Sequence, residues 1–166
     1  MNYNDFMAYL DTEQTESPVN LLHISQALHL GIYKSTQLHD KTSGLILKAT
    51  GKYKTFDKGC GFAIIINANY HKRRQRFTIA HEIAHYILHK DKIHTQLSDS
   101  ILYRSENLSR DEELQAHQLT ADILMPWSLI NKEIKKGLPY QNLAKKFEVS
   151  PSAMSIRIGV PLDDLK

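Results

Sequence analysis

The motif HEIAH at residues 81–85 contains the side chains that metal-assisted hydrolysis needs. The apolar pattern of the surrounding segment predicts a helix, on which residues four apart lie one turn apart on the same face. The imidazoles of His81 and His85 can therefore reach one metal ion, and zinc best suits two imidazoles and a carboxylate. A bound metal lowers the pKa of a water from ~15.7 to around 7. Glu82, beside His81, is then the expected general base for hydrolysis of a peptide bond.

The competing interpretation is a chance match, because the motif fixes only three positions. The other positions of residues 77–88 are mostly apolar and predict a buried helix. Two histidines and a glutamate on a buried helix are costly unless they are paired or bind a metal. This context favours a real metal site.

A third protein ligand is needed, because catalytic zinc usually takes three protein ligands and a water. Candidates lie in residues 109–117, which open a second helix that Pro126 ends. Glu112 and Glu113 point about 100° apart on a helix, so only one of them is expected to face the metal. From geometry alone either glutamate fits. Each also has the alternative of a solvated first-turn acid that favours the helix dipole.

Length and composition bound the class of protein. The chain has 166 residues, of which 42% are hydrophobic, enough for one domain with at most a small appendage. The net charge of +3 permits nucleic-acid contact without arguing for it. One cysteine, Cys60, excludes an internal disulfide and a cysteine-based zinc knuckle. Neither a signal peptide nor a membrane span is expected, so the prediction is a soluble, cytoplasmic protein.

Three segments are expected along the chain. Residues 1–16 are predicted to be a polar N-terminal segment with a short helix near residues 5–10. Residues 17–127 are predicted to form the main domain, and residues 128–166 a C-terminal helical segment.

Within the main domain, a helix is predicted over residues 19–28, with Ser17 as its N-cap and Pro18 at its first position. Its inward side chains are expected to be Leu21, Leu22, Ile24 and Leu28. Strands are predicted at residues 32–34, 44–48 and 62–67, and the last is apolar enough to be central. The polar stretch 91–110 is long enough for a lid or a substrate loop.

Two linked blocks resemble the ImmA/IrrE family of metallopeptidases. Residues 76–89, RFTIAHEIAHYILH, are similar to the family's block RFTxAHExxHxxxH. Residues 113–126, ELQAHQLTADILMP, are similar to its block ExxANxFAAxLLMP. With the helix and strand order before them, the resemblance covers most of residues 17–127. It implies an α+β, zincin-like fold in which a small sheet packs on the HExxH helix.

The resemblance also implies the ligand set: zinc held by His81, His85 and, carried over by position, Glu113. This sequence departs from the family pattern at three places. Leu119-Thr120 replaces the usual Phe-Ala, and His117 replaces the common asparagine. Gln115 stands where many members carry another glutamate, which favours Glu113 and leaves Glu112 open.

Two further histidines could support the site. His117 lies four residues after Glu113 and hence on the same helix face, so it is interpreted as a partner that holds a ligand in place. Proton donation in the cleft is the alternative. His89 lies ~6 Å further along the helix axis than His85. It is therefore expected to line the cleft or to support a ligand rather than to bind the same ion.

The basic run at residues 71–76 is typical of a solvated helix entry. The alternative is that it grips an acidic substrate or nucleic acid.

Residues 138–158 predict a helix, a turn and a second helix that Ser150 caps, with Pro151 at its first position. This segment resembles the helix-turn-helix-like part that often follows the peptidase region in the family. DNA binding would need a basic second helix that reads bases, and this one offers only Arg157. A structural or substrate-docking role is therefore favoured over DNA binding.

Together these features predict a zinc metallo-endopeptidase that uses zinc-activated water, with Glu82 as the general base, to hydrolyse a protein substrate. Family members commonly cleave repressors and are often encoded in mobile elements or stress-response modules. The resemblance therefore implies a helix-turn-helix repressor or an antitoxin as the partner. The alternative is a non-proteolytic stress-response or toxin–antitoxin regulator that acts by binding protein or DNA.

Overall fold

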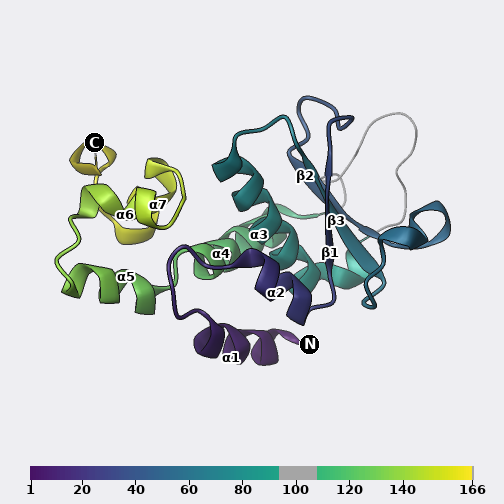
Figure 1. Ribbon diagram of the computed structural model, residues 1–166, viewed down its shortest axis with the longest axis horizontal. Coiled ribbons are helices and arrows are strands. Elements are labelled where there is room, and N and C mark those ends of the chain that lie inside the picture. The colour runs from purple at the N-terminus through teal and green to yellow at the C-terminus, as the bar shows by residue number, and fades with distance from the viewer. Residues whose placement is uncertain (94–107, 166) are drawn as a thin grey trace.

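Residues 1–93 and 108–165 are described by the computed structural model, and they form the expected α+β fold (Figure 1). The helices are α1 (Tyr3–Glu13), α2 (Leu21–Ala27), α3 (Lys72–His89), α4 (Arg110–Leu124), α5 (Trp127–Lys135), α6 (Tyr140–Lys146) and α7 (Pro151–Ile158). The strands are β1 (Gly31–Ser35), β2 (Gly44–Lys48) and β3 (Phe62–Asn67), and three short 3₁₀ helices span Gly51–Phe56, Lys90–Lys92 and Leu162–Leu165.

Figure 1 shows the sheet toward one end of the molecule and α5, α6 and α7 toward the other, with α3 and α4 between them. The predicted lid or substrate loop over residues 91–110 falls mainly on residues 94–107, which lie outside the described residues. Among the helices described, none combines the length and the apolar character that crossing a membrane requires.

The sheet confirms the prediction that residues 62–67 form the central strand. β3 pairs with β1 in parallel and with β2 antiparallel. Ile64 and Ile66 belong to the main buried cluster with the helices. Ala63 and Ile65 belong to a second cluster on the other face of the sheet. Burial on both faces explains why residues 62–66 of this strand are all apolar instead of alternating.

A glycine lets the edge strand β2 lie close to the motif helix α3. A Cβ atom added at Gly44 would lie 2.6 Å from Cγ2 of Thr78 and 2.8 Å from the carbonyl oxygen of Ile65. Any larger residue would push the strand away from the helix. The close approach therefore fixes where the sheet sits beside the first turns of α3.

The start of α2 differs from the prediction. The helix begins at Leu21, and the side chain of Asn20 accepts hydrogen bonds from the backbone N–H groups of Leu22 and His23. Asparagine is at least as good an N-cap as serine, so it sets the first turn. Ser17, predicted as the cap, instead precedes a cis peptide bond to Pro18.

The predicted inward face of this helix needs a matching correction. Leu21, Ile24 and Leu28 are buried as expected, but the side chain of Leu22 is 61% exposed. Moving the helix start does not change the helical period. Leu22 simply lies about 100° round the axis from Leu21, on the solvent side.

The N-terminal segment contributes to the core. The predicted short helix near residues 5–10 is confirmed as the longer α1, which buries Phe6 and Leu10. Nε2 of Gln14 donates to the carbonyl oxygen of Ile123, 2.8 Å away at the end of α4. One buried cluster includes Phe6 and, from α7, Met154. The division into segments 1–16, 17–127 and 128–166 stays a prediction.

The C-terminal region contains one helix that the sequence analysis missed. Pro126 ends α4 as predicted, but it is also the N-cap residue of α5. The predicted pair of helices over residues 138–158 is present as α6 and α7, and the side chain of Ser150 caps α7 as expected. A DNA-binding role for this pair stays a prediction.

The burial of α1 generates a stability prediction. Phe6→Ala should lower the free energy of unfolding by about 3–5 kcal/mol, because it removes a fully buried aromatic ring and leaves a cavity. Tyr3→Ala, on the same helix but 44% exposed, is the matched control and should cost far less. Urea denaturation of both variants measures the difference. Equal, small losses would show that α1 is not part of the core.

Candidate metal centre

Helix α3 carries the motif residues on its inward face. His71 caps the helix by accepting a hydrogen bond from the backbone N–H of Arg73 at 3.2 Å. The side chains of His81 and His85 lie one turn apart, and their rings meet edge to face with centroids 4.5 Å apart. Glu82 is fully buried, and His85 is nearly so. The helix therefore brings two imidazoles together, and it also carries the buried carboxylate of Glu82.

Helix α4 adds a carboxylate between the two imidazoles. The Nε2 atoms of His81 and His85 are 3.0 Å apart. Oε2 of Glu113 lies 3.4 Å from Nε2 of His81, and Oε1 lies 3.6 Å from Nε2 of His85. The structure thus brings together the three residues that the sequence analysis expected to hold a metal.

The spacing of these donor atoms fits a tetrahedral metal ion. Zinc bonds to imidazole nitrogen and carboxylate oxygen are ~2.0–2.2 Å long, which places neighbouring donors of a tetrahedron about 3.3 Å apart. The three measured separations, 3.0, 3.4 and 3.6 Å, lie on both sides of that value. Two imidazoles and a carboxylate would occupy three corners and leave the fourth for water or substrate.

Glu112 has a different task from Glu113. Its carboxylate accepts from the backbone N–H of Ser109 at 2.7 Å, and the Ser109 hydroxyl accepts from the backbone N–H of Glu112, forming a capping box. Its carboxylate also pairs with the ammonium group of Lys92. The Lys92 partner, followed by the Ser109 backbone, lowers the pKa of Glu112 to about 2. This glutamate therefore caps the start of the helix, and its partners are Ser109 and Lys92.

A chain of hydrogen bonds behind His85 fixes which of its nitrogens faces the site. Nε2 of His89 lies 3.4 Å from Oε1 of Gln115, an oxygen that can only accept, so this nitrogen carries the proton. Nδ1 of His89 is then an acceptor, and it lies 3.3 Å from Nδ1 of His85. His85 therefore keeps its proton on Nδ1. Its Nε2 lone pair is left toward Glu113, as metal binding requires.

His81 has a separate support on α4. The hydroxyl of Thr120 donates to the carbonyl oxygen of Ala116 at 2.6 Å, so its oxygen is free to accept from Nδ1 of His81 at 3.4 Å. Sequence reasoning missed both Thr120 and Gln115. Thr120 could have been found from its position seven residues after Glu113, which places it on the same helix face.

His117 lies at the open side of the site. Its ring centroid is 4.7 Å from that of His81 and 5.9 Å from that of Phe77. One ligand atom from each of His81, Glu113 and His117 can be chosen so that all three lie within 4.8 Å of one another. His117 is exposed where the other ligand candidates are buried or half-buried. His117 thus lies beside His81 at the exposed side of the site, and its role as a supporting residue stays a prediction.

Burial favours the neutral, metal-binding form of His85. Desolvation lowers the pKa of this imidazole below its ordinary value, while the nearby Glu113 carboxylate acts in the opposite sense. Metal ligands must be unprotonated, so the dry environment keeps a lone pair available at neutral pH. The donor set, its spacing and its protonation all fit a divalent metal.

The two glutamates provide a direct test of the ligand set. Glu113→Ala should lower zinc affinity by well over the ~10–100-fold that losing a supporting residue costs, because it removes one of three donors. Glu112→Ala should change zinc affinity little, since its carboxylate serves the helix start. Zinc titration against a fluorescent chelator compares both variants with the wild type. A larger loss of zinc affinity in Glu112→Ala than in Glu113→Ala would identify Glu112 as the ligand instead.

The chain behind His85 generates a second test. His89→Ala should lower zinc affinity by about 10–100-fold without abolishing binding, because His85 loses the group that orients it. His23→Ala, an exposed histidine on α2, is the control and should leave affinity unchanged. The same titration measures both. Unchanged affinity in His89→Ala would show that His85 needs no partner on that side.

Comparison with known proteins gives the family. A family model described as the IrrE N-terminal-like domain, Peptidase M78, matches residues 46–159, a range that includes both α3 and α4. The chain is also 37% identical over 95 residues to the radiation response metalloprotease IrrE of Deinococcus radiodurans. That match covers 54% of this chain and 28% of the relative, so the chain spans little more than a quarter of the relative's length. The chain therefore belongs to the ImmA/IrrE family of metallopeptidases, which implies a divalent metal as its cofactor.

Proposed function

We propose that this chain is a zinc-dependent endopeptidase of the zincin type, which hydrolyses a peptide bond in a protein substrate. The observation that carries the proposal is the convergence of two imidazoles and the Glu113 carboxylate within 3.0–3.6 Å of one another. Glu82 adds a buried carboxylate on the same helix. Together they supply a metal site and a base, as metal-assisted hydrolysis needs.

The donor chemistry favours zinc among the divalent metals. Two neutral imidazoles and one carboxylate are a common zinc set in hydrolases, whereas magnesium and calcium prefer oxygen donors throughout. When bound, zinc polarises a carbonyl group and makes a water more acidic.

The residues of the chain supply the remaining steps. Glu82 accepts the proton of the attacking water and passes it to the nitrogen of the leaving amine. Gln115 and His89 hold His85 in its ligand tautomer, and Thr120 does the same for His81. The exposed position of His117 suits a side chain that meets the substrate as it enters.

A protein substrate with a regulatory role is the best match to the family. The relative from Deinococcus radiodurans is named a radiation response metalloprotease, which supports a stress-response setting. We extend this to a helix-turn-helix repressor or an antitoxin as the substrate of this chain. The relative is much longer than the matched region, so its whole activity does not transfer with the match.

A DNA-binding function through α6 and α7 is the weaker candidate. Arg157 is the one basic residue of α7, and its guanidinium is engaged inside the protein. It donates to the carbonyl oxygen of Met125 at 3.0 Å and to the carboxylate of Asp122 at 2.7 Å. It also lies over the ring of Trp127. A base-reading helix needs such a side chain free to enter the groove of DNA.

The catalytic assignment is tested with Glu82→Gln. This variant should keep stoichiometric zinc but lose roughly 10²–10⁴-fold in cleavage rate, because an amide cannot accept the proton. The substrate is the purified product of a repressor gene that neighbours the gene for this chain, and mass spectrometry identifies the fragments. Glu112→Gln is the matched control and should cleave at the wild-type rate.

Two results would contradict the proposal. Cleavage by Glu82→Gln at the wild-type rate would show that the site does not act hydrolytically. A Glu82→Gln variant that cleaves nothing yet keeps full biological activity would show that the chain regulates by binding a partner.

A further inference from the structure

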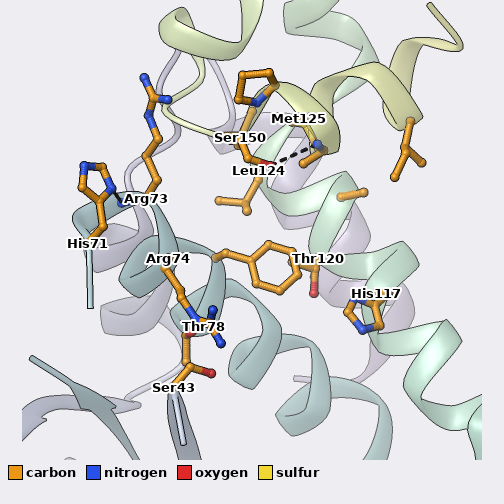
Figure 2. Close-up of a pocket in the computed structure, with 16 residues that line it drawn as sticks. Ser43, His71, Arg73, Arg74, Thr78, His117, Thr120, Leu124, Met125 and Ser150 are labelled. Carbon is orange, nitrogen blue, oxygen red and sulfur yellow. Dashed lines mark hydrogen bonds between the residues drawn. The ribbon is translucent and has the colours of Figure 1, made fainter. Parts of the chain in front are cut away.

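A groove leads from the candidate metal centre to the C-terminal helices. It has a volume of ≈ 830 Å³ and lies between α3, α4 and α7. His117 and Thr120, which both adjoin His81, line it at the metal end. Ser150 and Ile156 line it at the far end. Figure 2 shows His117 and Thr120 on one side of this groove and His71 with Arg73 on the opposite side.

The walls of the groove are largely apolar. Phe77 from α3, Leu124 from α4 and Val149 before α7 are among the residues that line it. Ile156, on α7, is 85% exposed, so its side chain is open to contact with a partner. Because apolar area that faces water is favourable to cover, this wall suits an apolar partner surface.

The charges at the groove are of one sign. Arg73 and Arg74 line it, and none of its described lining residues carries a carboxylate. Arg73 and Arg74 are exposed, and neither forms a salt bridge with a described residue, although the Arg74 guanidinium lies 4.3 Å from the centre of the Tyr70 ring. These cations are therefore available to a negatively charged partner.

We infer that this groove binds an acidic segment of the protein substrate that also carries large apolar side chains. This inference rests on the proposed peptidase function and names the substrate chemistry for that site. Apolar side chains of the segment pack on Phe77, Leu124 and Ile156. Its carboxylates pair with Arg73 and Arg74, and the chain then passes His117 toward the metal ligands. The volume is near the upper end of the ~300–1,000 Å³ usual for binding pockets, enough for more than one side chain.

The α7 side of the groove is connected to α4 and α3 by charged side chains. Arg157 ties α7 to the end of α4 through Asp122 and the carbonyl oxygen of Met125. Arg76 joins α3 to the turn before α7 through Glu148, 3.8 Å away. In this proposal the C-terminal helices supply a docking surface for the substrate. The role of these helices would then be substrate docking instead of DNA binding.

The test measures binding separately from cleavage. Full-length protein with Glu82→Gln and bound zinc is titrated into two short fluorescent peptides, one alternating leucine with glutamate and the other alternating leucine with lysine. The glutamate peptide should bind roughly tenfold more tightly, because it meets cations instead of being repelled by them. Added salt should reduce this preference.

Charge-reversed variants locate the binding surface. Arg73→Glu and Arg74→Glu should each weaken binding of the glutamate peptide about two- to fivefold. Lys72→Glu makes the same charge change on the same helix turn outside the groove and should have little effect. Ile156→Asp should weaken binding about tenfold, while Leu22→Asp, also exposed but on α2, should not.

Several outcomes would overturn the inference. Equal binding of the two peptides, or equal effects of Lys72→Glu and Arg73→Glu, would show that the groove does not select acidic segments. Tighter binding of a single-stranded oligonucleotide that competes with the peptide would identify a nucleic-acid surface. The cleavage assay keeps this inference apart from the proposed function. If Arg73→Glu and Ile156→Asp leave cleavage unaffected, only the substrate-binding role of the groove is rejected. If the peptide binds but no protein is cleaved, only the proposed peptidase function is rejected.

Discussion

The crossing of α3 over α4 is the contact on which the rest of the molecule depends. Ala80 and Ala84 on α3 and Ala116 on α4 are fully buried. Small side chains at a helix crossing let the two axes come close, and the distance between them sets which longer side chains can meet. At this crossing the Glu113 carboxylate reaches between His81 and His85.

The same crossing resolves a conflict between stability and chemistry. Histidines in a dry core are costly unless each nitrogen finds a partner, yet a metal ligand must leave one nitrogen free. The fold satisfies both demands by directing the second nitrogen of each ligand to α4, directly at Thr120 and through His89 at Gln115. The side-chain oxygen of Gln115 can only accept, so it determines which nitrogen of His89, and then of His85, carries the proton. The candidate ligands and the core thus share one set of polar contacts.

The sequence predicted those parts of the fold that local periodicity controls. The spacing of residues 81–85 and the apolar run at residues 62–67 each depend on neighbours in the chain. Two misses came from residues that can serve more than one local structure. Pro126 ends one helix and precedes another, and Asn20 competed with a serine for the same cap. The contact of Gln115 with a histidine 26 residues earlier depends on how two helices cross, which no local pattern contains.

The groove forms only where α3, α4 and α7 come together, so none of these helices predicts it alone. The basic start of α3 is a solvated helix entry on its own, and α7 on its own lacks the charge of a DNA-reading helix. Arg157, the residue that would be most useful to a DNA reader, is bound to Asp122 and holds α7 against α4. That attachment makes the exposed face of α7 one wall of the groove that Arg73 and Arg74 also line. Because α4 also carries Glu113, the proposed substrate groove and the candidate metal centre share this helix.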